Sequence, residues 1–197
     1  MTEAVRWGER LVLIPLAVLV ILRIIPQLSQ HPQLALFLVS EVVGVFLLLT
    51  QRKGPWSTDF FPVAIAFIGT SVGLLVGPIG MQLVPDLVST VLVLGGAGIA
   101  LAAKLFLGRS FGLVPANRGV RESGVYRVVR HPMYAGYMLN QLGFLLMYFS
   151  WPNVAIYAAA WTAFWLRAVE EEKFLRADPE YVRYADKVRY RLIPGVA

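Results

Sequence analysis

The sequence predicts an all-α, polytopic membrane protein with about six helical segments: four helices, then a C-terminal helical hairpin and a cytoplasmic amphipathic tail. Hydrophobic residues make up 57% of the 197 residues and charged residues 15%, whereas a soluble chain carries about 25% charged residues. The mean hydropathy is +0.64, and the apolar residues form blocks close to the ~20 residues that a helix needs to cross a bilayer. The basic residues lie between alternate blocks, which indicates an even number of crossings.

The apolar blocks give the helices in order. We expect helices over Leu11–Ile25, Leu34–Thr50, Phe60–Gly80, Leu87–Leu107, Tyr134–Phe149 and Val154–Leu166. The last two are short and flank Ser150–Asn153, which predicts a tight hairpin with Pro152 in the turn or at the first helical position. In the tail, Tyr181, Tyr184 and Val188 recur at helical spacing, which predicts an interfacial amphipathic helix that could close over a pocket.

The basic residues predict the topology. All 18 Lys and Arg residues except Arg23 fall on one face of the six-crossing arrangement, which also contains both termini and the long 108–133 connection. The positive-inside bias places this face in the cytoplasm, where the charge would contact anionic lipid headgroups. Nucleic-acid binding is not expected, because no basic stripe is interleaved with exposed aromatic residues. The chain has no cysteine and two histidines, so neither a disulfide nor a metal site is predicted.

The chain divides into two parts of unequal character. Residues 1–107 are predicted to be scaffold helices, and Gly69, Gly73 and Gly77 form a small-residue ridge suited to close helix packing. Residues 108–197 hold nearly all the polar residues and are predicted to be the functional core. Within the scaffold, Glu41 lies in a predicted membrane helix, where a carboxylate costs about 2.5–3.5 kcal/mol unless it is paired or faces a polar cavity. Both explanations are open, with Arg23 as one candidate partner.

Two clusters in the second part could carry chemistry. In GVYRVVRHPMYAGY (residues 124–137), His131 precedes Pro132 and should lie just outside the fifth helix. The positive end of that helix beside Arg130 suits an anionic group, although a basic aromatic interface belt would have the same composition. In the second cluster, Arg167 and Glu171 are four residues apart and share a helical face. Together the clusters suit a ligand with a negative group and a positive centre.

These residues carry a family resemblance. The Gly124–Tyr137 segment, the hairpin, the Arg167–Leu175 segment with its adjacent glutamates, the pair Tyr181 and Tyr184, and a terminal Leu-Ile-Pro occur in order over about residues 108–195. This pattern resembles the isoprenylcysteine carboxyl methyltransferase family, integral membrane enzymes related to the phospholipid N-methyltransferases.

The resemblance implies S-adenosylmethionine as the methyl donor, bound at the cytoplasmic side between the Arg-His-Pro segment, the hairpin and the tail. It implies that Arg167 addresses the methyl acceptor, with Arg130 as the other candidate for this catalytic positioning. The residues implied to contact the donor are Tyr126, His131, Pro132, Met133, Tyr134 and Glu171, with Val120 and Arg121 as further contacts.

The acceptor is less well defined. A carboxylate of a prenylcysteine-type lipophilic molecule needs only to be held in line for attack, whereas an amine must lose a proton, with Glu171, Glu172 or His131 as candidate bases. The segment Arg118–Glu122 lacks the histidine, and Asp178-Pro179 replaces the Phe-Gly, that prenylcysteine enzymes tend to carry. Phospholipid amine N-methylation and methylation of a small hydrophobic molecule are therefore alternatives, and a non-catalytic transporter or lipid-binding protein is the alternative from another class.

Overall fold

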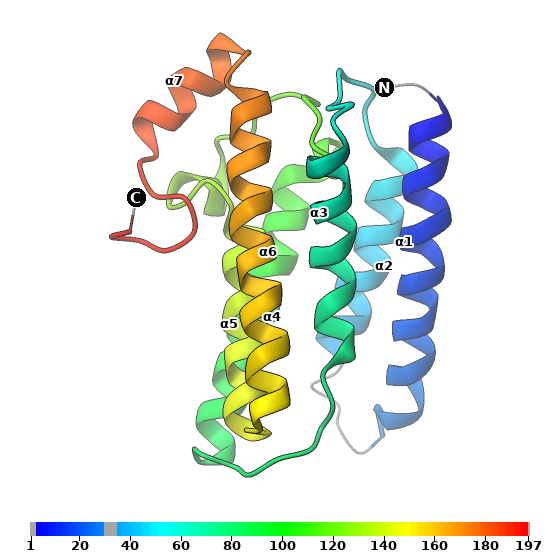
Figure 1. Cartoon of the computed structure of the whole chain (residues 1–197), viewed down its shortest axis with the longest axis vertical. Coiled ribbons are helices and arrows are strands. Elements are labelled where there is room, and N and C mark those ends of the chain that lie inside the picture. Colours follow the sequence, from blue (N-terminus) through cyan, green and yellow to red (C-terminus); the bar gives the residue numbers. More distant parts are fainter. Residues whose placement is uncertain (1–2, 30–34, 197) are drawn as a thin grey trace.

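The fold is a bundle of long helices with a short helix across one end (Figure 1). The computed structural model describes residues 3–29 and 35–196, and within these ranges the regular structure is helical, with no strand. The helices are α1 (Glu3–Ile24), α2 (Ala35–Thr50), α3 (Phe60–Ser71), α4 (Asp86–Leu107), α5 (Pro132–Met147), α6 (Trp151–Leu175) and α7 (Pro179–Lys187). The all-α prediction is confirmed. His31 and the predicted helix start at Leu34 lie outside the described residues.

One helix among the described residues is long and apolar enough to cross a membrane by length and composition. It covers Asp86–Ser110, and two shorter apolar helices cover Ala35–Thr50 and Phe60–Leu75. The predicted third helix was wrong at its end, because α3 stops at Ser71 and continues as a 3-10 turn over Val72–Leu75. Gly77 and Pro78 follow, and both disfavour a helix. Gly77 therefore lies beyond the helix and is not part of the small-residue ridge that was predicted.

Helices α5, α6 and α7 begin and end where local chemistry dictates. His131 precedes α5 and Pro132 is its first residue, as expected. Ser150 caps α6 by accepting a hydrogen bond from the Asn153 amide, and α6 runs on past Leu166 to Leu175. The predicted sixth helix was therefore too short, and the charged segment that follows it is helical. In the tail, the Asp178 carboxylate caps α7 by accepting from the Glu180 amide at 2.8 Å.

Helices α4 and α5 are in direct backbone contact. A Cβ atom on Gly96 of α4 would lie 2.3 Å from the Asn140 amide nitrogen, and one on Gly136 of α5 would lie 2.6 Å from the Ala100 amide nitrogen. No side chain fits at either position. Gly136 therefore makes room for the neighbouring helix and not for a ligand. Gly96 serves the same packing.

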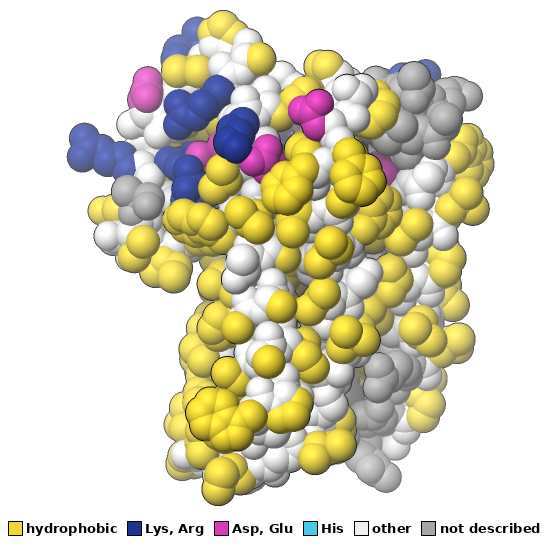
Figure 2. All heavy atoms as spheres, viewed as in Figure 1, with side chains coloured by type: hydrophobic (Ala, Val, Ile, Leu, Met, Phe, Trp, Pro, Cys, Tyr) yellow, Lys and Arg dark blue, Asp and Glu magenta, His cyan; other side chains and the backbone are white. Residues whose placement is uncertain are grey.

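Charged residues gather at one end of the bundle. In Figure 1, the N-terminal end of α1, the α2–α3 connection, the α4–α5 connection and α7 all lie at the upper end. The visible Lys, Arg, Asp and Glu side chains in Figure 2 are concentrated there, while the lower part is mostly hydrophobic and uncharged. This arrangement agrees with the predicted basic face.

A buried network ties α1 to the α4–α5 connection at this end. Glu9 is 1% exposed and its carboxylate accepts hydrogen bonds from the amides of Leu113 and Val114 at 3.1 and 2.6 Å. Arg118 lies 3.4 Å from the same carboxylate, and Gln51 also donates to it. The predicted scaffold thus holds the connection that follows it in place.

Candidate functional site

A cavity of about 400 Å³ lies inside the charged end of the bundle. Its volume is within the range of small-molecule sites. Part of its wall is formed by residues 110–121, the start of α5, the end of α6 and two tyrosines of α7; it also extends between α1, α2 and α3. The ordering of the α4–α5 connection and of α7 is what encloses it.

The end of α6 and the start of α5 form one wall. Tyr134 donates its hydroxyl to Glu171 at 3.1 Å. Its ring stacks on His131 and on Phe164, with both pairs of centroids 5.6 Å apart. The guanidinium of Arg167 lies 5.0 Å from the centre of the Tyr134 ring. A carboxylate, a cation and an aromatic face therefore meet at one place in the cavity.

Arg167 is held from two sides. Its Nη1 donates to the Thr70 hydroxyl at 3.2 Å and its Nη2 to the Leu113 carbonyl at 3.3 Å. Gly69 allows this position, because a Cβ there would lie 3.1 Å from Arg167 Cδ. The lack of a side chain at Gly69 of α3 therefore makes room for Arg167, which has a fixed position on the cavity wall.

Glu172, the next residue after Glu171, is buried away from the cavity and binds the tail. Its carboxylate accepts hydrogen bonds from Nε and Nη2 of Arg130 at 2.8 and 3.2 Å, and from Nε and Nη2 of Arg191 at 3.1 and 3.0 Å. His131 Nε2 lies 3.1 Å from Oε1 of the same carboxylate. Burial raises the pKa of Glu172, but the hydrogen bonds from His131, Arg191 and Arg130 outweigh it and hold the pKa well below its usual range.

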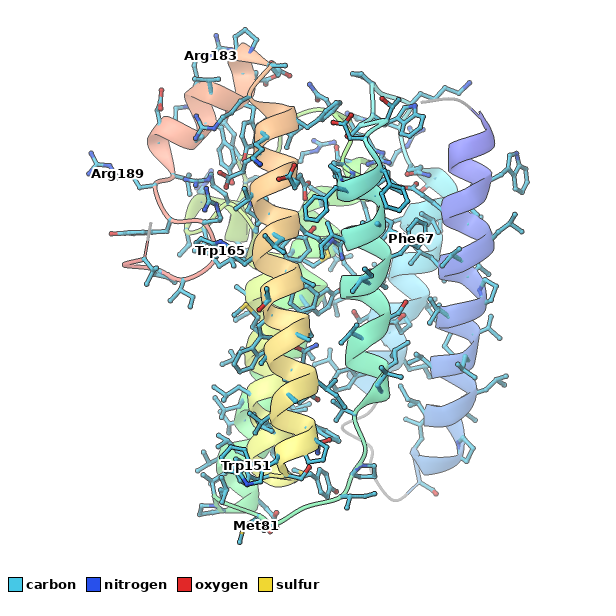
Figure 3. The ribbon with its side chains drawn as sticks, in the orientation of Figure 1. Phe67, Met81, Trp151, Trp165, Arg183 and Arg189 are labelled. Carbon is cyan, nitrogen blue, oxygen red and sulfur yellow. The ribbon has the colours of Figure 1, made fainter. Side chains whose placement is uncertain are left out.

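Arg130 also binds the tail directly, so Glu172 and Arg130 together form a clamp that holds the tail. Its Nη1 donates to the carbonyls of Val188 and Arg189 at 2.8 and 2.7 Å, so each of its three nitrogens has a protein partner. The amides of Arg130 and His131 donate to the carbonyls of Tyr190 and Arg191. The C-terminal tail therefore occupies the place beside the α5 N-terminus where the sequence suggested an anion. Arg191 also lies over Trp165, 4.9 Å from its ring centre; Figure 3 labels this tryptophan beside the tail.

A group of tyrosines forms the opposite wall. Tyr126, Tyr181 and Tyr184 are buried together, with Val120 and Met133 packed against them. Tyr184 donates its hydroxyl to the Tyr126 carbonyl at 2.8 Å. Tyr181 lines the cavity, and within the described residues its buried hydroxyl has no hydrogen-bond partner. Burial raises the pKa of all three phenols, which are uncharged at neutral pH.

Nine of the ten predicted site residues line this cavity. Pro132 differs, because it is fully buried at the first position of α5. Arg121 lies at the edge of the connection, where its Nε donates to the Ser110 hydroxyl at 3.4 Å. The residues that line the cavity are Val120, Arg121, Tyr126, Arg130, His131, Met133, Tyr134, Arg167 and Glu171. Their individual roles remain predictions.

Some polar residues at or beside the cavity were not among the predicted site residues. Tyr181 and Tyr184 were assigned to an interfacial helix that could close over a pocket, and α7 does so. Thr70 was missed, since nothing in its apolar surroundings marks it. Glu172 was considered a candidate base; the run of three adjacent acids was the available signal that one of them binds a cation.

Comparison with known proteins identifies the class. A family model described as phospholipid methyltransferase matches residues 79–178, which is half of the chain. The chain belongs to this family. The chain is also 32% identical over 106 residues to the protein-S-isoprenylcysteine O-methyltransferase A of Arabidopsis thaliana, which confirms the resemblance found in the sequence. The matched region is 50% of this chain and 54% of that relative, so the chain spans about half the length of the relative.

Proposed function

We propose that the protein is an S-adenosylmethionine-dependent methyltransferase of the membrane, acting on a lipophilic acceptor. The observation that carries this proposal is the convergence of Glu171, Tyr134 and Arg167 on one cavity wall. A cation-binding carboxylate and an anion-binding guanidinium side by side match a positively charged donor and an oxygen-bearing acceptor. The family and the curated relative support the same reaction class.

The residues present suit the methyl donor. Bound S-adenosylmethionine supplies a methyl group on a cationic sulfonium. Glu171 would attract its positive charge, and Tyr126 on the cavity wall is an aromatic side chain that could add cation–π contact. The Tyr181 hydroxyl, buried and without a partner among the described residues, would complete a hydrogen bond to a polar group of the donor. The α7 helix and the tail would exclude water from this end of the cavity.

Arg167 is the residue that we assign to the acceptor. Hydrogen bonds to Thr70 and Leu113 fix its guanidinium, and its side chain lines the cavity. Arg130 was the other candidate, but its bonds to Glu172 and to the tail carbonyls favour a role in holding the tail. A carboxylate acceptor held by Arg167 needs no base. An amine acceptor would leave Glu171 and His131 as candidate bases, because Glu172 is occupied by two arginines and has a lowered pKa.

The membrane placement is part of the proposal. Helices α1 to α6 would cross the bilayer, with both termini and the cavity mouth at the cytoplasmic side. The hydrophobic lower part in Figure 2 and the large exposed apolar side chains support this placement; among the latter are Leu11, Leu22, Phe46, Phe60 and Leu87. Residues 108–197 would form the methyltransferase core, and residues 1–107 would contribute Thr70 and the far cavity walls.

Calorimetric titration of S-adenosylmethionine, which carries the sulfonium charge that Glu171 would attract, into the detergent-solubilised protein tests the donor site. Binding to the wild type is expected, with a loss of affinity of at least about tenfold in Glu171→Ala, as for removal of a charged hydrogen-bonding group. Glu170→Ala is the matched control, because Glu170 pairs with Lys173 outside the cavity. Absence of binding to the wild type would refute the enzyme, and equal affinities in the two variants would refute the site.

The acceptor class is tested by transfer of labelled methyl groups into a lipid extract, followed by treatment with base. Carboxyl methyl esters release volatile labelled methanol, whereas methylated amines retain the label. We expect release, because Arg167 suits a carboxylate. Label that does not become volatile would exclude the carboxyl ester and favour the amine reaction or methylation of another small hydrophobic molecule.

A further inference from the structure

Glu41 and Lys104 form an ion pair at a part of the cavity that the proposed chemistry does not use. Lys104 Nζ lies 3.6 Å from Glu41 Oε1 and donates to the carbonyl and the hydroxyl of Ser40 at 3.0 and 2.9 Å. The partner of Glu41 is thus Lys104 of α4; the side chain of Arg23 is outside the described part of the chain. Both explanations offered for Glu41 hold, since it is paired and also lines the cavity.

The two members of the pair differ in exposure. The Lys104 side chain is 4% exposed and directs its N–H groups at α2, whereas the Glu41 side chain is 32% exposed. Gly44, one turn along α2, leaves room for the ammonium, which lies 3.4 Å from the position of a Cβ there. Both side chains line the cavity, and the more accessible of the two polar groups is the carboxylate, a hydrogen-bond acceptor.

The pair lies close to the proposed acceptor end of the cavity. Tyr134 and Tyr137 are one turn apart on α5, and both rings contact Phe164, at centroid distances of 5.6 and 5.9 Å. The Arg167 guanidinium is 5.0 Å from the first ring, and Lys104 Nζ is 5.9 Å from the second. The Glu41–Lys104 pair and Arg167 are therefore linked through the rings of Tyr137, Phe164 and Tyr134, and both line the same cavity.

The wall around Glu41 is otherwise apolar. Helices α1 and α2 contribute Leu13, Leu16, Ala17, Val20, Phe37, Val45 and Leu48 to it. A hydrocarbon chain would replace water against these side chains favourably. A carboxylate in such a wall gains most from a ligand that brings its own N–H or O–H group.

We propose that Glu41 is an acceptor-binding residue that accepts a hydrogen bond from an N–H or O–H group of the lipophilic acceptor, away from the atom that is methylated. Lys104 is a positioning residue that holds the carboxylate at the cavity wall. The inference rests on the proposed function and narrows its substrate class to lipophilic molecules with a hydrogen-bond donor in the part that lies against α2. A site built this way discriminates against a ligand that lacks the donor, because the Glu41 carboxylate would lose water on that side and gain no hydrogen bond in return.

The test uses two probes that differ in donor capacity. Octanamide has N–H groups, and N,N-dimethyloctanamide has none. Each is titrated calorimetrically into the detergent-solubilised protein saturated with S-adenosylhomocysteine. We expect octanamide to bind the wild type about tenfold more tightly than its dimethyl derivative, the size of one hydrogen bond to a charged group.

Glu41→Gln should reduce this preference from about tenfold to about threefold, because hydrogen bonds to a neutral amide are about half as strong as those to a carboxylate. Glu180→Gln on the exposed side of α7 is the matched control and should keep it. S-adenosylhomocysteine affinity should be the same in all three proteins, which also shows that each is folded.

The outcomes separate the two proposals. Two results would overturn the role of Glu41 and leave the methyltransferase proposal intact. One is equal affinity of the wild type for the two amides. The other is a preference for octanamide that is as large in Glu41→Gln as in the wild type. A loss of S-adenosylhomocysteine affinity in Glu41→Gln would place Glu41 in the donor site and also overturn it. Failure of the wild type to bind S-adenosylhomocysteine would instead overturn the proposed function.

Discussion

Arg130 and Glu172 form a bidentate ion pair, with Nε 2.8 Å from Oε1 and Nη2 3.2 Å from Oε2, buried between α5, α6 and the C-terminal tail. The remaining nitrogen of Arg130 holds two tail carbonyls. Arg130, the second candidate for positioning the acceptor, thus joins the helix that carries Tyr134 to the helix that carries Glu171. The stability of the protein and its affinity for the methyl donor should depend on this ion pair and on the packing around it.

Replacing Arg130 with Lys should release the tail. Lysine cannot pair with both carboxylate oxygens and reach the carbonyls of Val188 and Arg189. We expect a loss of about 1.5–3 kcal/mol in the free energy of unfolding, with a lower thermal midpoint and faster proteolysis within residues 188–196. Arg127→Lys, at an exposed position, is the control and should behave as the wild type. A tail that stays protected in Arg130→Lys would contradict the clamp.

The stability of the protein should fall in acid through Glu172. This residue lies beyond the apolar part of α6, and its folded-state pKa is well below the usual value of 4.5. A lowered pKa contributes stability above the unfolded pKa, and that contribution is lost as the pH falls through the folded pKa. The difference in thermal midpoint between the wild type and Glu172→Gln should be constant from neutral pH to about pH 5 and then shrink on further acidification. A difference that grew in acid would contradict this sign.

Adding one methyl group to Gly96 should disrupt the α4–α5 contact. The new Cβ would lie 2.3 Å from the Asn140 amide nitrogen, which is backbone and cannot move aside. We expect Gly96→Ala to lose about 1–3 kcal/mol of stability, as for other overpacked sites. Gly98→Ala is the matched control on the same helix, because nothing lies within 4 Å of its Cβ position. That variant should gain up to about 1 kcal/mol from helix propensity. Thermal unfolding of both variants measures the contrast.

Tyr134→Phe should weaken donor binding without unfolding the site. The variant keeps the ring stacking with His131 and Phe164 but loses the hydrogen bond to Glu171. We expect S-adenosylhomocysteine affinity to fall by up to about tenfold, because Glu171 loses the hydrogen bond that fixes its position. Tyr190→Phe in the tail should leave the affinity unchanged. A weakening no greater than in this control would separate Tyr134 from donor binding.

Much of the fold follows from apolar block length and from proline and cap residues. Pro132 and Ser150 mark where α5 and α6 begin, and both were predictable from backbone chemistry. The end of α3 at Ser71 was not, because its apolar composition continues to Gly80 although the chain leaves the helix. The extension of α6 to Leu175 was also missed, since a charged segment after an apolar block can be helix or loop.

For the candidate site, the motif brought the right residue types together but not their partners. Glu171 and Glu172 are adjacent, and their opposite directions depend on which face of α6 meets the tail. Arg130 and Arg167 are both buried arginines, and only the contacts of each separate the one bound to the tail from the one that faces Tyr134. Lys104 pairs with Glu41 across more than sixty residues of sequence, a distance that spacing within either helix does not reveal.

The contact between α4 and α5 also decides which parts of the molecule can move. Two helices whose backbones touch at Gly96 and Gly136 have no layer of side chains between them that could repack, so α4 and α5 should move as one rigid unit. Any widening of the cavity to admit a bulky molecule would then require movement of other helices such as α1 and α3, where side chains can slide past one another. An engineered cross-link between α4 and α5 should therefore leave turnover unchanged, whereas one that ties α1 or α3 to its neighbours should slow it.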